Sequence, residues 1–162
     1  MKHTISILVE NRAGVLSRIS GLFSRRGFNI DSLAVGITDD PTISRITIIV
    51  NGDDYTVEQV EKQLNKLVDV IKLKRLSAGE SISRELMLVK VSCTAETRGD
   101  ITDIAKIMQS KISDISANSI TLETSDTTDR LEIMEELLKP YGILEVVRTG
   151  TIALQKGPSR LS

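Results

Sequence analysis

Two residues of the sequence, Asn11 and Gly14, have types and spacing suited to holding a small zwitterion. They follow an alternating apolar run and come directly before a long amphipathic pattern, which places them at the start of a predicted helix. The backbone N–H groups of a first helical turn lack intrahelical partners and carry partial positive charge, so they suit a carboxylate. Gly14 has no Cβ to keep a ligand off the backbone, and the amide of Asn11 could meet an ammonium group.

Residues on both sides of this helix would complete such a site. Val15, Leu16 and Ile30 could supply an apolar wall, and Asn29 adds a second polar group at the start of the next strand. The predicted ligand is therefore a small apolar amino acid. The pattern also fits an ordinary helix start, with the asparagine as N-cap and the glycine incidental. Spacing alone leaves both interpretations open.

Other chemically active residue types are scarce. Cys93 is the single cysteine, so no intramolecular disulfide and no CxxC metal or redox motif can form. His3 is the single histidine, so every Ser/His or Cys/His pair would depend on it. We predict no catalytic residues and no metal site in this chain, with Cys93 serving in core packing.

Composition restricts the partners. The chain has 162 residues, 40% of them apolar, which allows one ordinary domain or two small ones with a real core. Its formal charge is −1, so no strong field attracts nucleic acid or anionic lipid. No apolar run approaches the roughly 18 residues of a membrane helix, and the start lacks the pattern of a signal peptide. We expect a cytoplasmic protein that binds neither nucleic acid nor membrane.

The first half of the chain predicts the element order βαββαβ. Apolar residues alternate in the strand over 3–9, and a helical stripe runs from Gly14 to a stop at Gly27. The remaining predicted elements are a strand over 28–38, a strand over 44–50, a helix carrying Val57, Val60, Leu64, Leu67 and Val68, and a strand over 70–76.

The stretch 77–83, "SAGESIS", is small and polar, as is typical of a boundary between compact units. From Arg84 the same succession begins again, with a hairpin around Ala117–Asn118 and a helix capped by Asp126 or Thr127. The chain therefore contains a repeat of pattern.

Each half has the size of a ferredoxin-like unit, an antiparallel four-stranded sheet with two helices on one face. The predicted fold class is α+β, two such βαββαβ domains in tandem. Units this small have limited cores, so we expect a second copy of the chain to bury sheet edges or faces. Ser32, Ala34 and Gly36 share one side of their strand and are small, which would let another element approach, although they could equally face solvent.

Three blocks carry a family resemblance. Residues 5–48, "ISILVENRAGVLSRISGLFSRRGFNIDSLAVGITDDPTISRITI", resemble the N-terminal ACT domain of the regulatory small subunits of acetolactate synthase (acetohydroxyacid synthase). The blocks "RELMLVKV" (84–91) and "PYGILEVVRTGTIAL" (140–154) resemble that family's C-terminal domain. Together the blocks extend over nearly the whole chain.

The resemblance implies a non-catalytic partner that activates a thiamine-diphosphate-dependent catalytic subunit and confers feedback inhibition by branched-chain amino acids, usually valine. In this family the effector lies between two ACT domains of a homodimer. The matching positions are Asn11, Gly14, Val15 and Leu16 on one chain, with Asn29 and Ile30 on the other. Thiamine diphosphate, Mg and FAD would belong to the catalytic subunit, and this chain would hold no cofactor.

The predicted domains are 1–76, an ACT domain for effector binding and dimerisation; 77–83, a linker; 84–156, a ferredoxin-like domain that activates the catalytic subunit; and 157–162, a disordered tail. The main alternative is an ACT-domain amino-acid sensor that modulates a different enzyme or a transcription factor.

Two further alternatives fit less well. An acylphosphatase would need a glycine-rich phosphate loop, and the loop after the first strand has one arginine and one glycine without the rest of that pattern. An RNA-recognition domain stacks bases on aromatic side chains of its sheet, whereas only 2% of this chain is aromatic.

Overall fold

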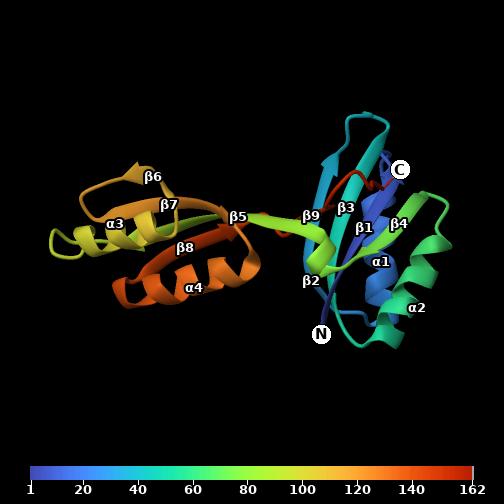
Figure 1. Ribbon diagram of the computed structural model, residues 1–162, viewed down its shortest axis with the longest axis horizontal. Helices are drawn as coiled ribbons and strands as arrows, with labels where there is room; N and C mark the ends of the chain where they lie inside the picture. The colour runs from blue at the N-terminus through green and yellow to red at the C-terminus, as the bar shows by residue number, and fades with distance from the viewer. Residues whose placement is uncertain (162) are drawn as a thin grey trace. The chain divides into compact units, whose positions relative to one another are not determined.

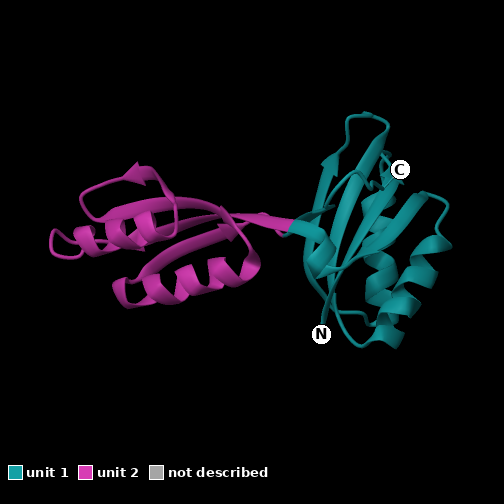
Figure 2. Ribbon diagram, in the orientation of Figure 1, with its two compact units in different colours: residues 1–82, 151–162 teal, residues 83–150 magenta. Residues whose placement is uncertain are grey.

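The computed structural model describes residues 1–161 and divides into two compact units (Figure 2). The first unit contains residues 1–82 and the chain from Thr151 on, and the second contains residues 83–150. The elements of the first unit are β1 (Lys2–Glu10), α1 (Val15–Arg26), β2 (Ile30–Ile37), β3 (Ile43–Asn51), α2 (Asp54–Asn65), β4 (Val70–Leu76), the 3₁₀ turn η1 (Ala78–Glu80) and β9 (Ile152–Gln155) (Figure 1).

The remaining elements form the second unit, with the first residues of β5 preceding it. They are β5 (Ser81–Ser92), α3 (Arg98–Ile107), β6 (Lys111–Ile115), β7 (Ser119–Asp126), α4 (Thr128–Leu138), the 3₁₀ turn η2 (Lys139–Tyr141) and β8 (Ile143–Arg148). Within the described part of the chain, no helix has both the length and the apolar character that crossing a membrane would require.

Both units have the ferredoxin-like arrangement. The strand order is β2-β3-β1-β4 in the first sheet and β6-β7-β5-β8 in the second, with antiparallel pairing in each. In the first unit, alternate residues of β1 and β3 pack against buried residues of α1 and α2 in one core. A separate core joins β5 and β7 to α3 and α4. The predicted fold class, two tandem βαββαβ units, is confirmed.

Helix α1 forms where the apolar spacing predicts it. Val15, Ile19, Leu22 and Phe23 are buried, which is the stripe of one helical face. Gly27 ends the helix with φ 68°, and its N–H donates to the carbonyl oxygens of the last turn. A left-handed residue after a helix is usually glycine because a Cβ is strained there.

Two predicted helix details differ from the structure. Helix α2 ends at Asn65, and Val68, which we placed on its apolar stripe, is 90% exposed. The chain turns after the helix, with the Val70 N–H donating to the Leu67 carbonyl. At the start of α4, Thr127 occupies the N-cap position as predicted, but its side chain makes no capping hydrogen bond, and Asp126 Oδ1 accepts from the Thr127 N–H at 2.7 Å.

The boundaries of the compact units differ from the predicted domain boundaries. Strand β5 already begins at Ser81, inside the stretch predicted as a linker. Residues 152–155, which fall within the predicted second domain, form strand β9, which lies in the first unit and pairs with β5. The structure describes the predicted tail up to residue 161 as a turn and an irregular segment, and Ser162 lies outside the described residues.

The returning chain contacts the face of the first sheet that is opposite the helices. The Ser32 Oγ atom accepts a 2.8 Å hydrogen bond from the Thr151 N–H, and the Arg45 guanidinium donates to the Ala153 carbonyl at 3.0 Å. Lys74 Nζ donates to Gln155 Oε1 at 2.8 Å. The small side chain of Ser32 thus lets another backbone approach β2, as its sequence pattern permits.

Candidate functional site

The loop between β1 and α1 places Gly14 at the N-terminus of the helix in a left-handed conformation. Its φ is 86°, and no side chain caps the helix. The Val15 N–H donates to the Arg12 carbonyl at 3.4 Å, and no side chain within residues 1–161 accepts from the other N–H groups of the first turn. A residue with a Cβ would be strained at this φ, so the backbone here requires glycine.

Asn11 lies on the same loop but does not cap the helix. Its Nδ2 donates to the Pro41 carbonyl at 3.0 Å, and its backbone N–H donates to the Thr42 carbonyl at 2.8 Å. These contacts fix the loop against the turn between β2 and β3. Among the described residues, no donor is bonded to the Asn11 Oδ1 atom, which leaves an exposed acceptor beside the start of α1. The interpretation of Asn11 as an N-cap is therefore wrong.

A buried carboxylate holds two arginines at this corner. Asp69 accepts from Arg18 Nε at 2.7 Å and from Arg12 Nη2 at 3.0 Å, and its side chain is 8% exposed. The Arg18 hydrogen bond lowers the pKa of Asp69, and the same bond raises the pKa of Arg18. Arg12 also pairs with Glu10. Asp69 therefore organises a charged corner. The sequence patterns did not predict this role of Asp69.

Arg18 lies close to Gly14. A Cβ on Gly14 would be 3.1 Å from the Arg18 Nη1 atom, so a guanidinium covers one side of the helix start. The helix N-terminus carries partial positive charge where the carboxylate of an amino acid would bind, while the Arg18 guanidinium beside it is ion-paired with Asp69. The exposed oxygen of Asn11 adds an acceptor for the ammonium group.

The two apolar residues predicted for this side differ in exposure. Leu16 is 43% exposed and can contact a ligand. Val15 is 3% exposed and packs in the first core. Val15 therefore contributes its backbone to the helix start, while Leu16 presents an apolar side chain beside it.

The structure places Asn29 and Ile30 at the other end of α1. The helix has 12 residues, so its ends are about 18 Å apart. Asn29 Nδ2 donates to Asp31 at 3.2 Å, and Ile30 packs against the first core at the start of β2. One chain thus does not join the two predicted walls of the site.

The remaining reactive groups have structural surroundings. Cys93 is buried in the second core, and the His3 ring lies 3.1 Å from the Gly52 carbonyl. Over residues 1–161, no group of three or more His, Cys, Asp or Glu side chains is placed to hold a metal ion. The groups left at the β1–α1 corner are the helix N-terminus, the Asn11 amide and the ion-paired guanidinium groups of Arg12 and Arg18.

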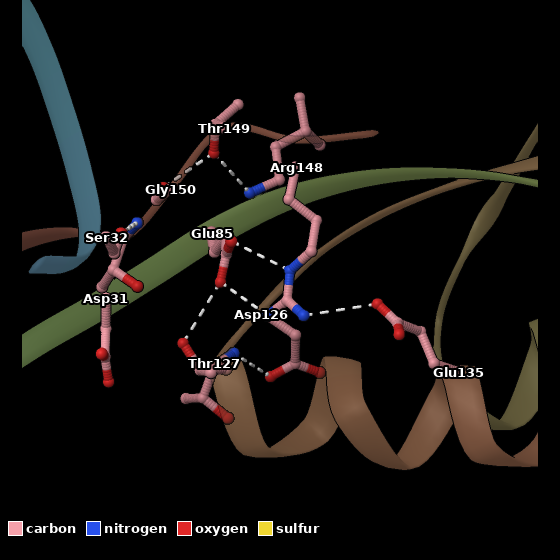
Figure 3. A network of polar contacts seen from close by, with 12 residues as sticks. Asp31, Ser32, Glu85, Asp126, Thr127, Glu135, Arg148, Thr149 and Gly150 are labelled. Carbon is pink, nitrogen blue, oxygen red and sulfur yellow. Dashed lines mark hydrogen bonds and ion pairs between the residues drawn. The ribbon is translucent and has the colours of Figure 1, made fainter. Parts of the chain in front are cut away.

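A second polar network lies where the chain leaves the second unit (Figure 3). Arg148 donates to both oxygens of Glu85, at 2.9 and 2.8 Å, and to Glu135 at 3.3 Å. The Glu85 side chain is 7% exposed, and its hydrogen bonds raise the pKa of Arg148. This bidentate pair ties β5 to the end of β8.

Comparison with known proteins gives the same family over both units. Residues 5–72 match the family model for the AHAS small subunit-like ACT domain. Residues 84–157 match the model for the small subunit of acetolactate synthase. The second match includes β9, although β9 packs in the first compact unit. The boundary of the family model therefore differs from the boundary between the compact units.

Individual members of this family match this chain over nearly the whole length of both sequences. The acetolactate synthase small subunit of Mycolicibacterium smegmatis is 47% identical over 156 residues, covering 96% of this chain and 92% of the relative. A probable acetolactate synthase small subunit of Archaeoglobus fulgidus is 47% identical over 157 residues, covering 97% and 98%. The solved structure of the acetolactate synthase small subunit from Thermotoga maritima has a TM-score of 0.91 and 36% identity, covering 98% and 99%.

Proposed function

This chain belongs to the family of acetolactate synthase small subunits, and we propose that it activates the catalytic subunit of that enzyme and confers feedback inhibition by branched-chain amino acids. Among these amino acids, valine is the effector that we expect. In this proposal the chain is a regulatory partner without catalytic residues of its own, acting in the biosynthesis of valine, leucine and isoleucine.

The observation that carries the proposal is the corner around Gly14. An uncapped helix N-terminus, a guanidinium and an exposed amide oxygen lie together within the part of the chain that matches the ACT family model. These groups are complementary to the carboxylate and ammonium groups that every free amino acid carries.

A second copy of the chain would complete the site. Asn29 and Ile30 lie about a helix length from Asn11 and Gly14, so they cannot hold the same small ligand within one chain. In a homodimer formed through the first units, the start of β2 from one copy would face the helix start of the other. The amino acid would then bridge two chains, and its binding would depend on how they pack.

Feedback inhibition requires only that the effector binds two arrangements of the dimer with different affinity. A coupling of about 1–3 kcal/mol is typical, and burying a valine side chain is worth roughly 1.5–3 kcal/mol. One methylene contributes about 0.8 kcal/mol, so leucine and isoleucine should bind within roughly one order of magnitude of valine.

The cofactors of the reaction would all belong to the catalytic subunit. Thiamine diphosphate, Mg and FAD are assigned there, and this chain would hold none of them. Its second unit would make the activating contact.

Reconstitution tests this function. The purified chain is added to an acetolactate synthase catalytic subunit, acetolactate formation is measured, and valine, leucine and isoleucine are titrated into the mixture. We expect activation by the chain and inhibition by all three amino acids, strongest with valine.

Two results would contradict the proposal. Absence of activation by the chain would remove the catalytic subunit as its partner. Amino-acid binding detected by calorimetry, together with no effect on that enzyme, would favour the alternative of a sensor for a different enzyme or a transcription factor.

A further inference from the structure

The chain returns from the second unit to the first at Gly150 and Thr151. Gly150 has φ 87°, a conformation that L side chains rarely adopt. The next residue, Thr151, is buried, and its N–H donates to Ser32 Oγ at 2.8 Å. The first residue after the crossing is therefore fixed to strand β2.

The residues before the crossing are fixed to the second unit. Arg148 is held by the buried carboxylate of Glu85 through two hydrogen bonds. The Thr149 N–H donates to the Leu86 carbonyl at 3.0 Å, and the Leu86 N–H donates back to Thr149 Oγ1 at 3.1 Å. Gly150 is thus the single residue between Thr149, which is bonded within the second unit, and Thr151, which is bonded to β2.

Ser32 is also close in sequence to the proposed effector wall. It follows Ile30 by two residues, and the pairing of β2 with β3 shifts register between them. A register shift of this kind interrupts the ladder locally and bends the strand. Asp31 lies at the irregularity, where it binds Asn29 and forms an ion pair with Lys2.

We propose that the hydrogen bond between Ser32 and Thr151 transmits effector occupancy from the start of β2 to the second unit. An effector that contacts Asn29 and Ile30 shifts the start of β2, Ser32 carries the shift to the Thr151 backbone, and the anchored residues Arg148 and Thr149 pass it on. This inference rests on the proposed function, because it deepens the regulation of the same site. Coupling of this kind is a free energy between two sites and can be measured as such.

The test compares Ser32→Ala with Ser32→Thr. Alanine removes the oxygen that accepts from Thr151, whereas threonine keeps a hydroxyl and suits a strand. For each full-length variant, calorimetry gives the dissociation constant for valine. The affinity for the catalytic subunit is then measured with and without saturating valine, and the ratio of the two affinities is the coupling.

We expect Ser32→Ala to bind valine within about twofold of the parent and to lower the coupling at least about threefold, the effect of one ordinary hydrogen bond. Ser32→Thr should keep the coupling of the parent. Hydrogen exchange adds a readout independent of the effector, because the Thr151 amide should exchange faster in Ser32→Ala than in the parent.

Lys74→Met is the matched control. It removes the Lys74 to Gln155 hydrogen bond, which holds the same returning segment to β4 instead of β2. Its coupling should equal that of the parent if the path runs through β2.

Three results would overturn the inference. Unchanged coupling in Ser32→Ala would show that this bond transmits nothing. Equal losses in Ser32→Ala and Lys74→Met would mean that any loosening of the returning segment has the same effect. A parent chain that neither binds valine nor responds to it would remove the proposed function, and this inference with it.

Discussion

Gly14 is the position at which the proposed effector site is most sensitive to an added side chain. We expect Gly14→Asp to abolish inhibition by valine while leaving activation of the catalytic subunit largely intact. The new carboxylate would lie beside Arg18 and the helix N-terminus, where it competes with the carboxylate of the effector. Inhibition curves of the reconstituted enzyme with parent and variant chains provide the measurement.

The matched control is Gly14→Ala, which adds a Cβ at this positive φ, at a strain of about 1–2 kcal/mol and at least that of aspartate, without adding a charge. It should weaken valine inhibition less than Gly14→Asp does. A Gly14→Asp chain that is inhibited like the parent would mean that the effector binds elsewhere.

Asp69 makes the stability of the first unit depend on pH. Its pKa in the folded protein lies below the ordinary value of 3.8, because Arg18 donates a hydrogen bond to it. At pH values between the two pKa values the unfolded chain binds more protons, so this stabilisation is complete above about pH 5 and is lost as the pH falls through the lowered folded value. Asp69→Asn removes the titrating group.

Urea unfolding checks this expectation. The free energy of unfolding of the parent and of Asp69→Asn is measured at several pH values between about 3 and 7, a range that includes the ordinary carboxyl pKa. The parent should be the more stable protein at neutral pH, and the difference should shrink as the pH falls below about 4. A difference that stays constant over this range would refute the assignment of the acid dependence to Asp69.

The sequence predicts the glycine and asparagine of the corner but not the carboxylate that organises it. Gly14 and Asn11 are recognisable because a helix start has a local pattern. Asp69 contacts Arg12 across 57 positions of the chain, and only the packing of β4 beside β1 brings them together. No periodicity of the intervening residues carries that information.

At the scale of elements, the regular segments follow from local patterns. The βαββαβ order of both halves and the stop at Gly27 are predicted because apolar spacing and glycine conformations are local properties. Strand β9 was not distinguished from the end of the second domain, since it is only four residues long and has its partners in the first unit.

An ion pair between Glu85 and Arg148 links β5 to the end of β8 beside their backbone pairing. We expect Glu85→Ala to destabilise the second unit by about 2 kcal/mol, because Arg148 would lose its bidentate partner in a partly buried position and keep only Glu135. The free energy of unfolding is obtained from denaturant titration followed by circular dichroism.

An exposed ion pair in the same sheet supplies the control. Lys90 and Glu145 are 3.8 Å apart with both side chains exposed, so Glu145→Ala should cost at most about 0.5 kcal/mol. Similar losses in the two variants would show that burial does not distinguish these pairs.

At the scale of the whole molecule, the position of β9 in the first unit determines which deletion can separate effector binding from activation. Removing residues 77–162 would delete β9, which contacts the sheet of the first unit. Replacing residues 83–150 with a short flexible linker keeps β9 in the chain and removes only the second unit. We expect this variant to bind valine with the affinity of the parent and to lose all activation of the catalytic subunit.

Calorimetry and the reconstituted activity assay measure the two properties separately. Full activation by the shortened chain would move the activating contact to the first unit. Loss of valine binding with the fold retained would move the effector site away from it.

The central claim is that the corner at Gly14 is half of an effector site, and that a second copy of the chain supplies the other half. Asn11→Ala and Asn29→Ala would each damage one wall, so dimers of either variant alone should respond weakly to valine. In a mixed dimer one site carries both substitutions and the other carries neither.

The deciding measurement is therefore valine inhibition of the reconstituted enzyme with an equimolar, re-equilibrated mixture of Asn11→Ala and Asn29→Ala chains. Random pairing restores about one quarter of all sites to the parent sequence, so the mixture should recover high-affinity inhibition that neither variant shows alone. A mixture no more sensitive to valine than its two components would contradict a site shared between chains.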